Sequence, residues 1–259
     1  MIGQRLMSNS FVTAAKKVLK TEADALAKLQ DDLPIDFSDL VKLILNLTGR
    51  VIVSGVGKSG HIGSKIAATL ASTGTPAYFV HATEASHGDL GMITAQDLCL
   101  LISNSGETIE MFDILTHARR FGIPVATMSS NCESTLVKTA DFKLCLPMAE
   151  EACPIGMAPT TSTTMMLALG DALAVALMEA KSFNAENFKV FHPGGKLGAK
   201  LMTVGQLMHK NDTLPLVKIE TSMKETLLTM SSKGFGIAAI VDEIGCLVGV
   251  ITDGDLRRH

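Results

Sequence analysis

The chain has 259 residues, of which 47% are apolar and 19% are charged, and its formal net charge is -3. A mean hydropathy of +0.30 with so few charges excludes a disordered chain over most of its length. The 23 Lys and Arg residues are scattered among 26 Asp and Glu residues and form no basic stripe, so we expect no nucleic-acid partner.

Cysteine usage and the apolar runs predict a cytoplasmic protein. The N-terminal ten residues lack the apolar stretch of a signal peptide. The most apolar run, residues 165–178, is shorter than the roughly 20 residues that span a bilayer, so we expect a core helix and no membrane association. The cysteines form no C-x-x-C pair, and we expect reduced thiols without structural zinc; they are Cys99, Cys132, Cys145, Cys153 and Cys246.

The first predicted elements are two helices within residues 8–47, broken near Leu33–Pro34. After them, short apolar runs alternate with longer helical stretches. This alternation predicts an α/β fold, a five-stranded parallel sheet with helices on both faces. The expected strands are 51–53, 77–80, 98–102, 124–127 and 142–146, and the expected helices are 62–72, 107–121, 134–140 and 160–181.

A turn-rich segment at residues 192–205 predicts a domain boundary. We therefore expect one domain over residues 1–200 and a second over residues 201–259. In the second domain the pattern predicts a helix, a strand, a turn and a strand, followed by Asp-Gly-Asp-Leu; the ranges are 223–233, 237–241, 242–245 and 247–252. So short a domain buries little core alone.

Ser, Thr and Gly residues gather where three of the helices should begin, at residues 54–60, 103–108 and 160–164. Each start taken alone is explained as an N-cap. In a parallel sheet, however, these starts share the edge at the carboxyl ends of the strands, where ligands bind. Three of them together offer N–H groups and hydroxyls to a phosphate and a polyol, which favours a sugar phosphate as ligand.

The first helix start also fits the dinucleotide-binding pattern G-x-G-x-x-G through Gly55, Gly57 and Gly60. That pattern requires an acidic residue at the end of the second strand, where His81 stands instead. A Walker A loop fails as well, because Ile52 occupies the position of its leading glycine. The sequence therefore disfavours a nicotinamide enzyme.

Charged residues near the same edge are candidates for the chemistry. Glu110 is expected one turn into the second of these helices and Glu151 after the fifth strand. Lys58 is expected in the first loop and His192 in the Pro-Gly-Gly turn. Taken singly, each has a plain interpretation as a solvated helix face, a loop charge or a turn residue.

Seven motifs between residues 55 and 198 are specific as a set. They are Gly-Val-Gly-Lys-Ser-Gly-His-Ile-Gly at 55–63, Ser-Thr-Gly-Thr-Pro at 72–76, His-Gly-Asp-Leu-Gly-Met at 87–92, Ile-Ser-Asn-Ser-Gly-Glu at 102–107, Glu-Ala-Cys-Pro-Ile-Gly-Met-Ala-Pro-Thr at 151–160, Gly-Asp-Ala-Leu-Ala-Val-Ala-Leu at 170–177 and His-Pro-Gly-Gly-Lys-Leu-Gly at 192–198. Together they resemble the D-arabinose 5-phosphate isomerase family, whereas sugar isomerase (SIS) domains in general share only the fold and the Ser-x-Ser-Gly loop. The segment at 249–256 resembles the end of a cystathionine-β-synthase-type (CBS) repeat.

The resemblance implies reversible interconversion of D-arabinose 5-phosphate and D-ribulose 5-phosphate, the entry to synthesis of the Kdo sugar of lipopolysaccharide. It also implies a SIS fold, a homotetramer and active sites at subunit contacts. The family's catalytic positions fall on Lys58, Glu110, Glu151 and His192. Substrate contacts are implied at Gly74, Thr75, His81, His87, Ser103, Ser105 and Thr108, with His81 also a candidate ligand for an inhibitory zinc ion.

An aldose–ketose isomerisation opens the sugar ring, moves a proton between C1 and C2 through an enediol, and stabilises the enediolate. We expect Glu110 or Glu151 to carry the carbon proton and His192 or His87 to open the ring, with Lys58 countering negative charge. This route requires no cofactor.

Two further interpretations stay open. A SIS protein that senses a phosphosugar without turnover would share the Ser-x-Ser-Gly loop, although residues 1–48 lack the basic bias of a DNA-binding helix-turn-helix. A paralogue used in sugar-alcohol catabolism would share all the motifs.

The CBS repeat is the first of an incomplete pair, so nucleotide regulation is not expected, and Thr252 and Asp255 are weak ligand candidates.

Overall fold

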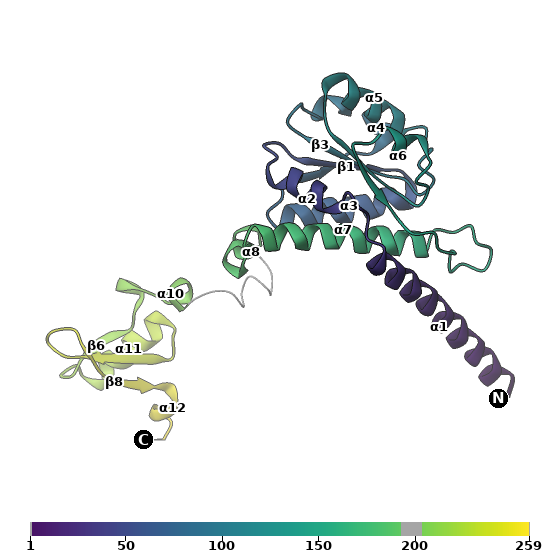
Figure 1. The fold of residues 1–259 in the computed structure, drawn as a ribbon. Coiled ribbons are helices and arrows are strands. Elements are labelled where there is room, and N and C mark those ends of the chain that lie inside the picture. Colours follow the sequence, from purple (N-terminus) through teal and green to yellow (C-terminus); the bar gives the residue numbers. More distant parts are fainter. Residues whose placement is uncertain (1, 193–203, 259) are drawn as a thin grey trace. The chain divides into compact units, whose positions relative to one another are not determined.

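The chain forms two compact units, residues 1–198 and residues 199–259 (Figure 1). The computed structural model describes residues 2–192 and 204–258. Most of the turn-rich segment expected at residues 192–205 lies outside the described residues, and of its His-Pro-Gly-Gly motif only His192 is described.

Five parallel strands form the sheet of the larger unit, in the order β2-β1-β3-β4-β5. Every residue of β1, β3 and β4 is buried, which is typical of strands covered on both faces. The predicted α/β class is confirmed, with strand ends within two residues of expectation. The strands are β1 (Val51–Gly55), β2 (Ala77–Phe79), β3 (Leu98–Ile102), β4 (Val125–Ser129) and β5 (Phe142–Cys145).

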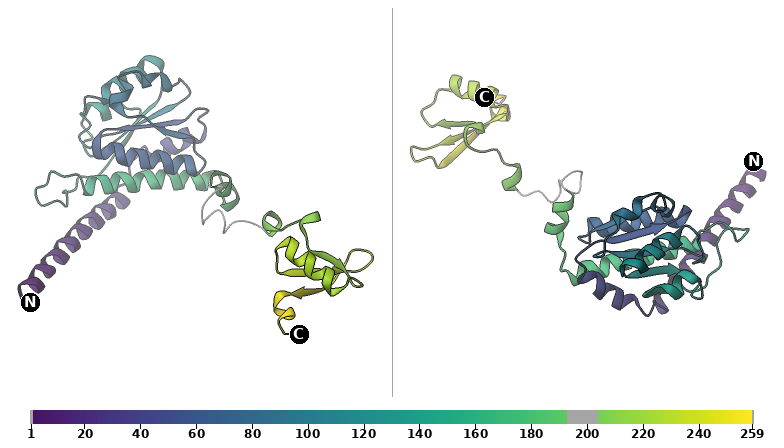
Figure 2. Two further views of the ribbon diagram at one scale, coloured as in Figure 1. Left: turned by 180° about the vertical axis from the view of Figure 1, so that it is seen from behind. Right: turned by 90° about the horizontal axis from the view of Figure 1, so that it is seen from above.

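Helices cover both faces of this sheet (Figures 1 and 2). One apolar cluster joins the sheet to α1 (Ile2–Asp31), α2 (Phe37–Leu45), α3 (Gly57–Ser72) and α7 (Thr161–Ala180). A second cluster joins it to the helices of the other face, which are α4 (Ala82–Ala85), the 3-10 turn η1 (Asp89–Met92), α5 (Met111–Phe121) and α6 (Thr135–Thr139). After α7 follows α8 (Ala185–Phe191).

Helices α3 and α7 lie side by side and run in the same direction. Near their middles Gly170 approaches Ile66 so closely that an added Cβ would lie 2.4 Å from the Ile66 side chain. Lys65 of α3 forms an ion pair with Asp171 of α7. Ser59 near the start of α3 contacts Met166 near the start of α7, and Lys181 after α7 contacts Gly74 after α3. Both helices therefore lead from the carboxyl edge of the sheet, where the strands end, to the amino edge, where the strands begin.

Among the described residues, α7 is the one helix whose length and composition would allow a membrane span. Its buried residues include Met165, Leu169, Leu173 and Leu177, which recur at every fourth position and belong to the core cluster that packs on the sheet. The predicted core helix over residues 160–181 is thus confirmed.

Two helix starts differ from expectation. Helix α3 begins at Gly57, five residues before the predicted start, and Gly57 adopts a φ of +59° there. Helix α5 begins at Met111, four residues later than predicted. Glu107, expected in the first turn of this helix, lies in a loop, where its carboxylate accepts the backbone N–H of Thr135 at 2.7 Å. That partner lies at the start of α6, so the contact is not local in sequence.

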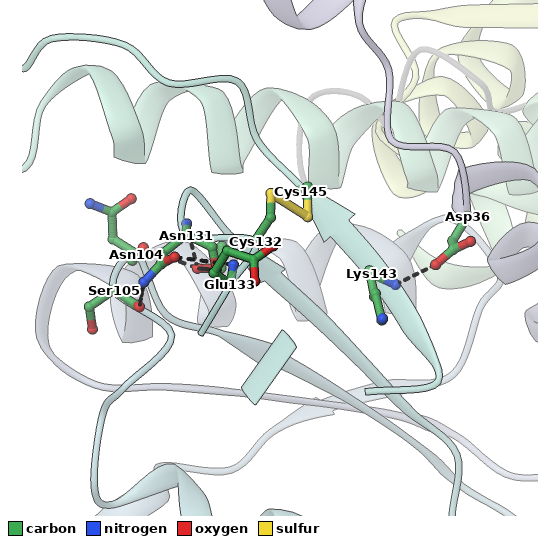
Figure 3. The surroundings of a disulfide bond; sticks show 9 residues. Asp36, Asn104, Ser105, Asn131, Cys132, Glu133, Lys143 and Cys145 are labelled. Carbon is green, nitrogen blue, oxygen red and sulfur yellow. Dashed lines mark hydrogen bonds between the residues drawn. A yellow bond between two sulfur atoms is a disulfide. The ribbon is translucent and has the colours of Figure 1, made fainter. Parts of the chain in front are cut away.

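A disulfide bond joins Cys132 and Cys145, whose Cα atoms are 5.6 Å apart (Figure 3). The expectation of five reduced thiols was therefore wrong for this pair. Cys145 ends β5 and Cys132 lies in the loop after β4, so the carboxyl ends of two paired strands bring them together. Of the cysteines described, Cys99, Cys153 and Cys246 are free.

The smaller unit has a three-stranded sheet in the order β6-β7-β8. Its small core contains Val217, Met230 and Ala238. The predicted helix and two strands are confirmed, whereas β6 and three short helical turns were not predicted. The elements are α10 (Val204–Leu207), η2 (Asn211–Thr213), β6 (Leu216–Lys218), α11 (Met223–Lys233), β7 (Ile237–Val241), β8 (Leu247–Thr252) and α12 (Asp253–Leu256).

The carboxylate of Asp97 ties the start of β1 to the start of β3. Its side chain is fully buried and accepts the backbone N–H of Arg50 at 2.7 Å and the N–H and hydroxyl of Thr94 at 2.8 and 2.9 Å. Burial raises the pKa of Asp97, but these hydrogen bonds and the Arg50 charge outweigh it and leave that pKa below its usual range. The ionised carboxylate therefore stabilises the folded state above the ordinary pKa of Asp, and this contribution is lost as the pH falls through the lowered pKa.

We predict that Asp97→Ala lowers the free energy of unfolding by roughly 2–4 kcal/mol, because it leaves buried donors without an acceptor. Urea unfolding followed by tyrosine fluorescence measures this in the larger unit, since Tyr78 is the only tyrosine and the chain has no tryptophan. The control is Asp39→Ala, which removes an exposed ion pair with Lys42 and should cost less than about 1 kcal/mol. Equal losses in the two variants would contradict the prediction.

Candidate active site

The predicted site residues divide between the two edges of the sheet. The loops at the carboxyl edge carry Lys58, His81, His87, Ser103, Ser105, Thr108, Glu110 and Glu151. Gly74 and Thr75 precede β2 and therefore lie at the amino edge. His192 follows α8, beyond the amino-edge end of α7.

The loop between β1 and α3 is closely packed backbone against backbone. A Cβ on Gly60 would lie 2.9 Å from the carbonyl oxygen of Gly55, so the first turn of α3 lies directly against the end of β1. Lys58, the second residue of α3, is exposed. Its ammonium group is thus free to meet an anion at the start of this helix.

The loop after β3 is held in shape by its own hydroxyls. Ser103 Oγ lies 2.7 Å from Thr108 Oγ1 and accepts the backbone N–H of Gly106 at 3.0 Å. Ser105 Oγ is exposed and accepts the N–H of Glu107 at 3.2 Å. Hydroxyls and N–H groups are thereby presented beside the Lys58 loop, because β1 and β3 are neighbours in the sheet.

The loop between β4 and α6 is hydrogen-bonded to this one. Ser130 donates to the side-chain oxygen of Asn104 at 2.8 Å. Asn131 donates to the carbonyl of Ser105 at 3.2 Å (Figure 3). Asn104 does not cap α5, because Glu110 occupies the N-cap position of that helix.

Glu110 and Glu151 have contrasting surroundings. Glu110 is exposed, makes no side-chain cap bond at the start of α5, and has no hydrogen bond to its carboxylate within the described residues. Glu151 is half-buried at the start of α7, where it accepts the N–H of Thr160 at 2.7 Å, the Thr160 hydroxyl at 3.0 Å and the Ser162 hydroxyl. One carboxylate is free to move and the other is fixed.

Hydrogen bonding keeps Glu151 ionised. Burial raises the pKa of Glu151, but the hydrogen bonds from Ser162 and Thr160 outweigh it and hold that pKa below its usual range. A cavity of about 560 Å³ lies beside this carboxylate, lined also by Lys17 and Thr21 of α1. This contribution from α1 was not predicted, because nothing local in α1 marks contact with a loop more than a hundred residues away.

The two histidines after β2 differ in their roles. His81 caps α4, accepting the backbone N–H of Thr83 on Nδ1 at 3.3 Å, so its Nε2 remains for a ligand. His87 is exposed in the turn after α4. In the described part of the chain no three His, Cys, Asp or Glu side chains gather as a metal site, and zinc binding at His81 stays a prediction.

A second set of polar contacts lies at the amino edge. The motifs marked Gly74, Thr75 and His192 in it, but not Lys181. Lys181, directly after α7, donates to the carbonyl of Gly74 at 2.9 Å and to Thr75 Oγ1 at 2.7 Å. Partial burial lowers the pKa of Lys181. His192 stacks on Phe188 with ring centres 3.7 Å apart.

Helix α7 separates these two groups. Glu151 is bonded to its first turn and Lys181 follows its last, so its 20 residues place the two ends about 30 Å apart at 1.5 Å per residue. The described parts of one chain therefore do not bring Glu151 and Thr75 to a single small ligand.

Comparison with known proteins identifies the family. The SIS domain family matches residues 44–176 and the CBS domain family residues 204–259. The arabinose 5-phosphate isomerase KdsD of Yersinia pestis is 51% identical over 249 residues, covering 96% of this chain and 76% of that protein. The chain belongs to the arabinose 5-phosphate isomerase family. KdsD of Pseudomonas aeruginosa is 49% identical over the same coverage.

A solved structure of a relative contains a ligand. The Escherichia coli CFT073 protein c3406 in complex with arabinose 5-phosphate is 40% identical, with a TM-score of 0.69, and the match covers 71% of this chain and 98% of that one. The predicted SIS fold is thus confirmed by both the family match and this solved structure.

We predict that Ser162→Ala raises the pKa of Glu151, because it removes a hydroxyl that donates to the charged carboxylate. Carbon-13 NMR of labelled glutamate side chains, titrated from pH 7 downward, measures the midpoint. Thr163→Ala is the control, since the Thr163 hydroxyl donates to the carbonyl of Thr160 and not to Glu151. An unchanged Glu151 midpoint in the Ser162→Ala variant would contradict the assignment.

Proposed function

We propose that this chain is an isomerase that interconverts D-arabinose 5-phosphate and D-ribulose 5-phosphate. The observation that carries the proposal is a carboxyl edge with a hydroxyl-rich loop, an exposed Lys58 and two carboxylates, in a chain 51% identical to an arabinose 5-phosphate isomerase. The product would supply synthesis of Kdo and hence of lipopolysaccharide.

In this proposal the negatively charged phosphate group of the substrate binds at the carboxyl edge. Hydroxyls of Ser103, Ser105 and Thr108 and the N–H groups around them suit the phosphate oxygens. The ammonium group of Lys58 compensates negative charge on the phosphate or on the enediolate. Contacts to the sugar from His81 and His87 complete the expected set.

We propose that Glu110 moves the proton between C1 and C2. Its carboxylate is free, whereas both oxygens of Glu151 are held by hydrogen bonds. A base must approach the carbon-bound proton, which a mobile side chain can do once substrate orders it. Glu151 then acts as a fixed negative charge that orients the start of α7, and His192 or His87 opens the ring. A carboxylate and an imidazole suffice for this route, so we propose that it needs no metal.

We also propose that each active site takes residues from two chains, within a homotetramer. The support is the separation along α7, which leaves Lys58, Glu110 and Glu151 at one edge of the sheet and Gly74, Thr75 and His192 at the other. A second copy that presents its amino edge to the carboxyl edge of the first would complete the set.

The activity is tested with D-arabinose 5-phosphate in D₂O after treatment with EDTA. We expect NMR to show D-ribulose 5-phosphate that carries deuterium at C1, because the proton taken from C2 of the aldose exchanges with solvent before a proton is delivered to C1 of the enediol. Glu110→Gln should lower the rate by about 10²–10⁴.

No ketose from the wild-type chain would refute the isomerase and favour a sensor. Full activity of Glu110→Gln with loss of activity in Glu151→Gln would reverse the assignment of the base. Activity that disappears with EDTA and returns with a divalent metal would refute the metal-free route.

The shared site is tested by mixing variants. Lys58→Ala and His192→Ala should each be nearly inactive, and random co-assembly of the two chains should restore about a quarter of the wild-type activity, since half of the pairings are mixed and each holds one intact site. The control is Lys58→Ala mixed with Glu151→Ala, where both changes lie at one edge and every site carries a defect. Recovery in both mixtures, or in neither, would contradict the shared site.

A further inference from the structure

Lys181 joins the end of α7 to the turn that precedes β2. Its ammonium group donates to two successive residues of that turn, the carbonyl of Gly74 and the hydroxyl of Thr75, more than a hundred residues away in sequence. An ammonium group carries only donors, so Thr75 Oγ1 must accept and its own hydrogen is left to donate elsewhere. Lys181 therefore fixes both the position and the hydrogen-bonding polarity of the turn.

The same turn also packs on an aromatic ring. Gly74 has a φ of +86°, and a Cβ there would lie 2.8 Å from the ring of Phe183. Phe183 stacks on Phe191, the last residue of α8, with ring centres 6.1 Å apart. The turn, Lys181 and helix α8 are thus linked through Phe183 into one packed group.

The packing of α3 on α7 does not depend on Lys181. The pair Lys65–Asp171 and the contact of Gly170 with Ile66 already join the two helices near their middles. The contact of Lys181 with the turn comes beyond the ends of both helices. Lys181 therefore acts on the turn itself, through the Gly74 carbonyl and the Thr75 hydroxyl.

We propose that Lys181 is a positioning residue for substrate binding, which holds the Gly74–Thr75 turn in the conformation that contacts the sugar phosphate. This inference rests on the proposed function, because the contact of the turn with substrate is part of it. Lys181 acts through the turn and supplies no group to the proton transfer.

Three variants test the proposal in the full chain. Lys181→Met removes the donors and keeps the apolar stem, and Lys181→Gln is the second removal variant if the first does not fold. Lys181→Arg keeps a charged donor. Lys65→Met is the matched control, because it removes a lysine contact that joins α3 to α7 but leaves the turn untouched.

Two measurements are made on each variant. Hydrogen exchange by mass spectrometry follows the amides of Gly74 and Thr75, whose N–H groups donate to Ala71 and Leu70. Steady-state kinetics with D-arabinose 5-phosphate separates KM from kcat. We expect Lys181→Met to speed exchange of the turn and to raise KM about tenfold with kcat within about twofold, since binding and not chemistry is weakened. Lys181→Arg and Lys65→Met should keep the wild-type KM.

Unchanged exchange in both removal variants would overturn the proposal, as would faster exchange with an unchanged KM. A loss confined to kcat would also overturn it, since it would place Lys181 in the chemical step. If the wild-type chain does not turn over the substrate, the proposed function fails and the substrate role of Lys181 fails with it, while the exchange data still decide whether Lys181 holds the turn.

Discussion

Parallel hydrogen bonding of the five strands forces each connection to cross from one edge of the sheet to the other, because a parallel pair cannot be joined by a tight turn. The strands therefore all end at one edge, where the following loops and helix starts present N–H groups and hydroxyls. The Lys58 loop, the Ser103–Thr108 loop and the Glu151 carboxylate follow from this constraint. The same constraint returns the chain to the amino edge before β2. For this reason Gly74 and Thr75 lie far from the polar residues of the carboxyl edge.

Burial made most of the sheet predictable from sequence. The strands β1, β3 and β4 are apolar or small at nearly every position because helices cover both faces, and such runs stand out between turn residues. Helix starts were harder, since the contacts that set them are distant in sequence. Glu107 looks like a helix-capping residue, yet it bonds to Thr135 and helps to keep residues 103–110 as a loop. The pairing of Cys132 with Cys145 also depends on strand order, which their spacing does not reveal.

The candidate site was predictable as a list of residues but not as an arrangement. Motifs marked Lys58, Glu110, Glu151 and His192 together, and nothing in them indicated that His192 lies beyond the far end of α7. Nor could the motifs distinguish a free Glu110 from a fixed Glu151, because the donors to Glu151 come from the start of α7. Lys181 escaped notice for a similar reason: a lysine after a helix is common, and only the fold shows that it contacts the turn before β2.

The composition of α7 follows from its place between the two edges. Its middle must pack against the sheet and α3, so it is apolar enough to have the composition of a membrane span, and Gly170 is small enough to admit Ile66. Its ends meet polar groups. At the start of α7, Thr160 and Ser162 donate to the Glu151 carboxylate, and the helix dipole favours a negative charge there. Lys181 follows the last turn, where the helix dipole favours a positive charge. Because a well-packed helix of this length cannot shorten, the two polar groups are kept apart, and this separation is the physical reason for proposing a site shared between two chains.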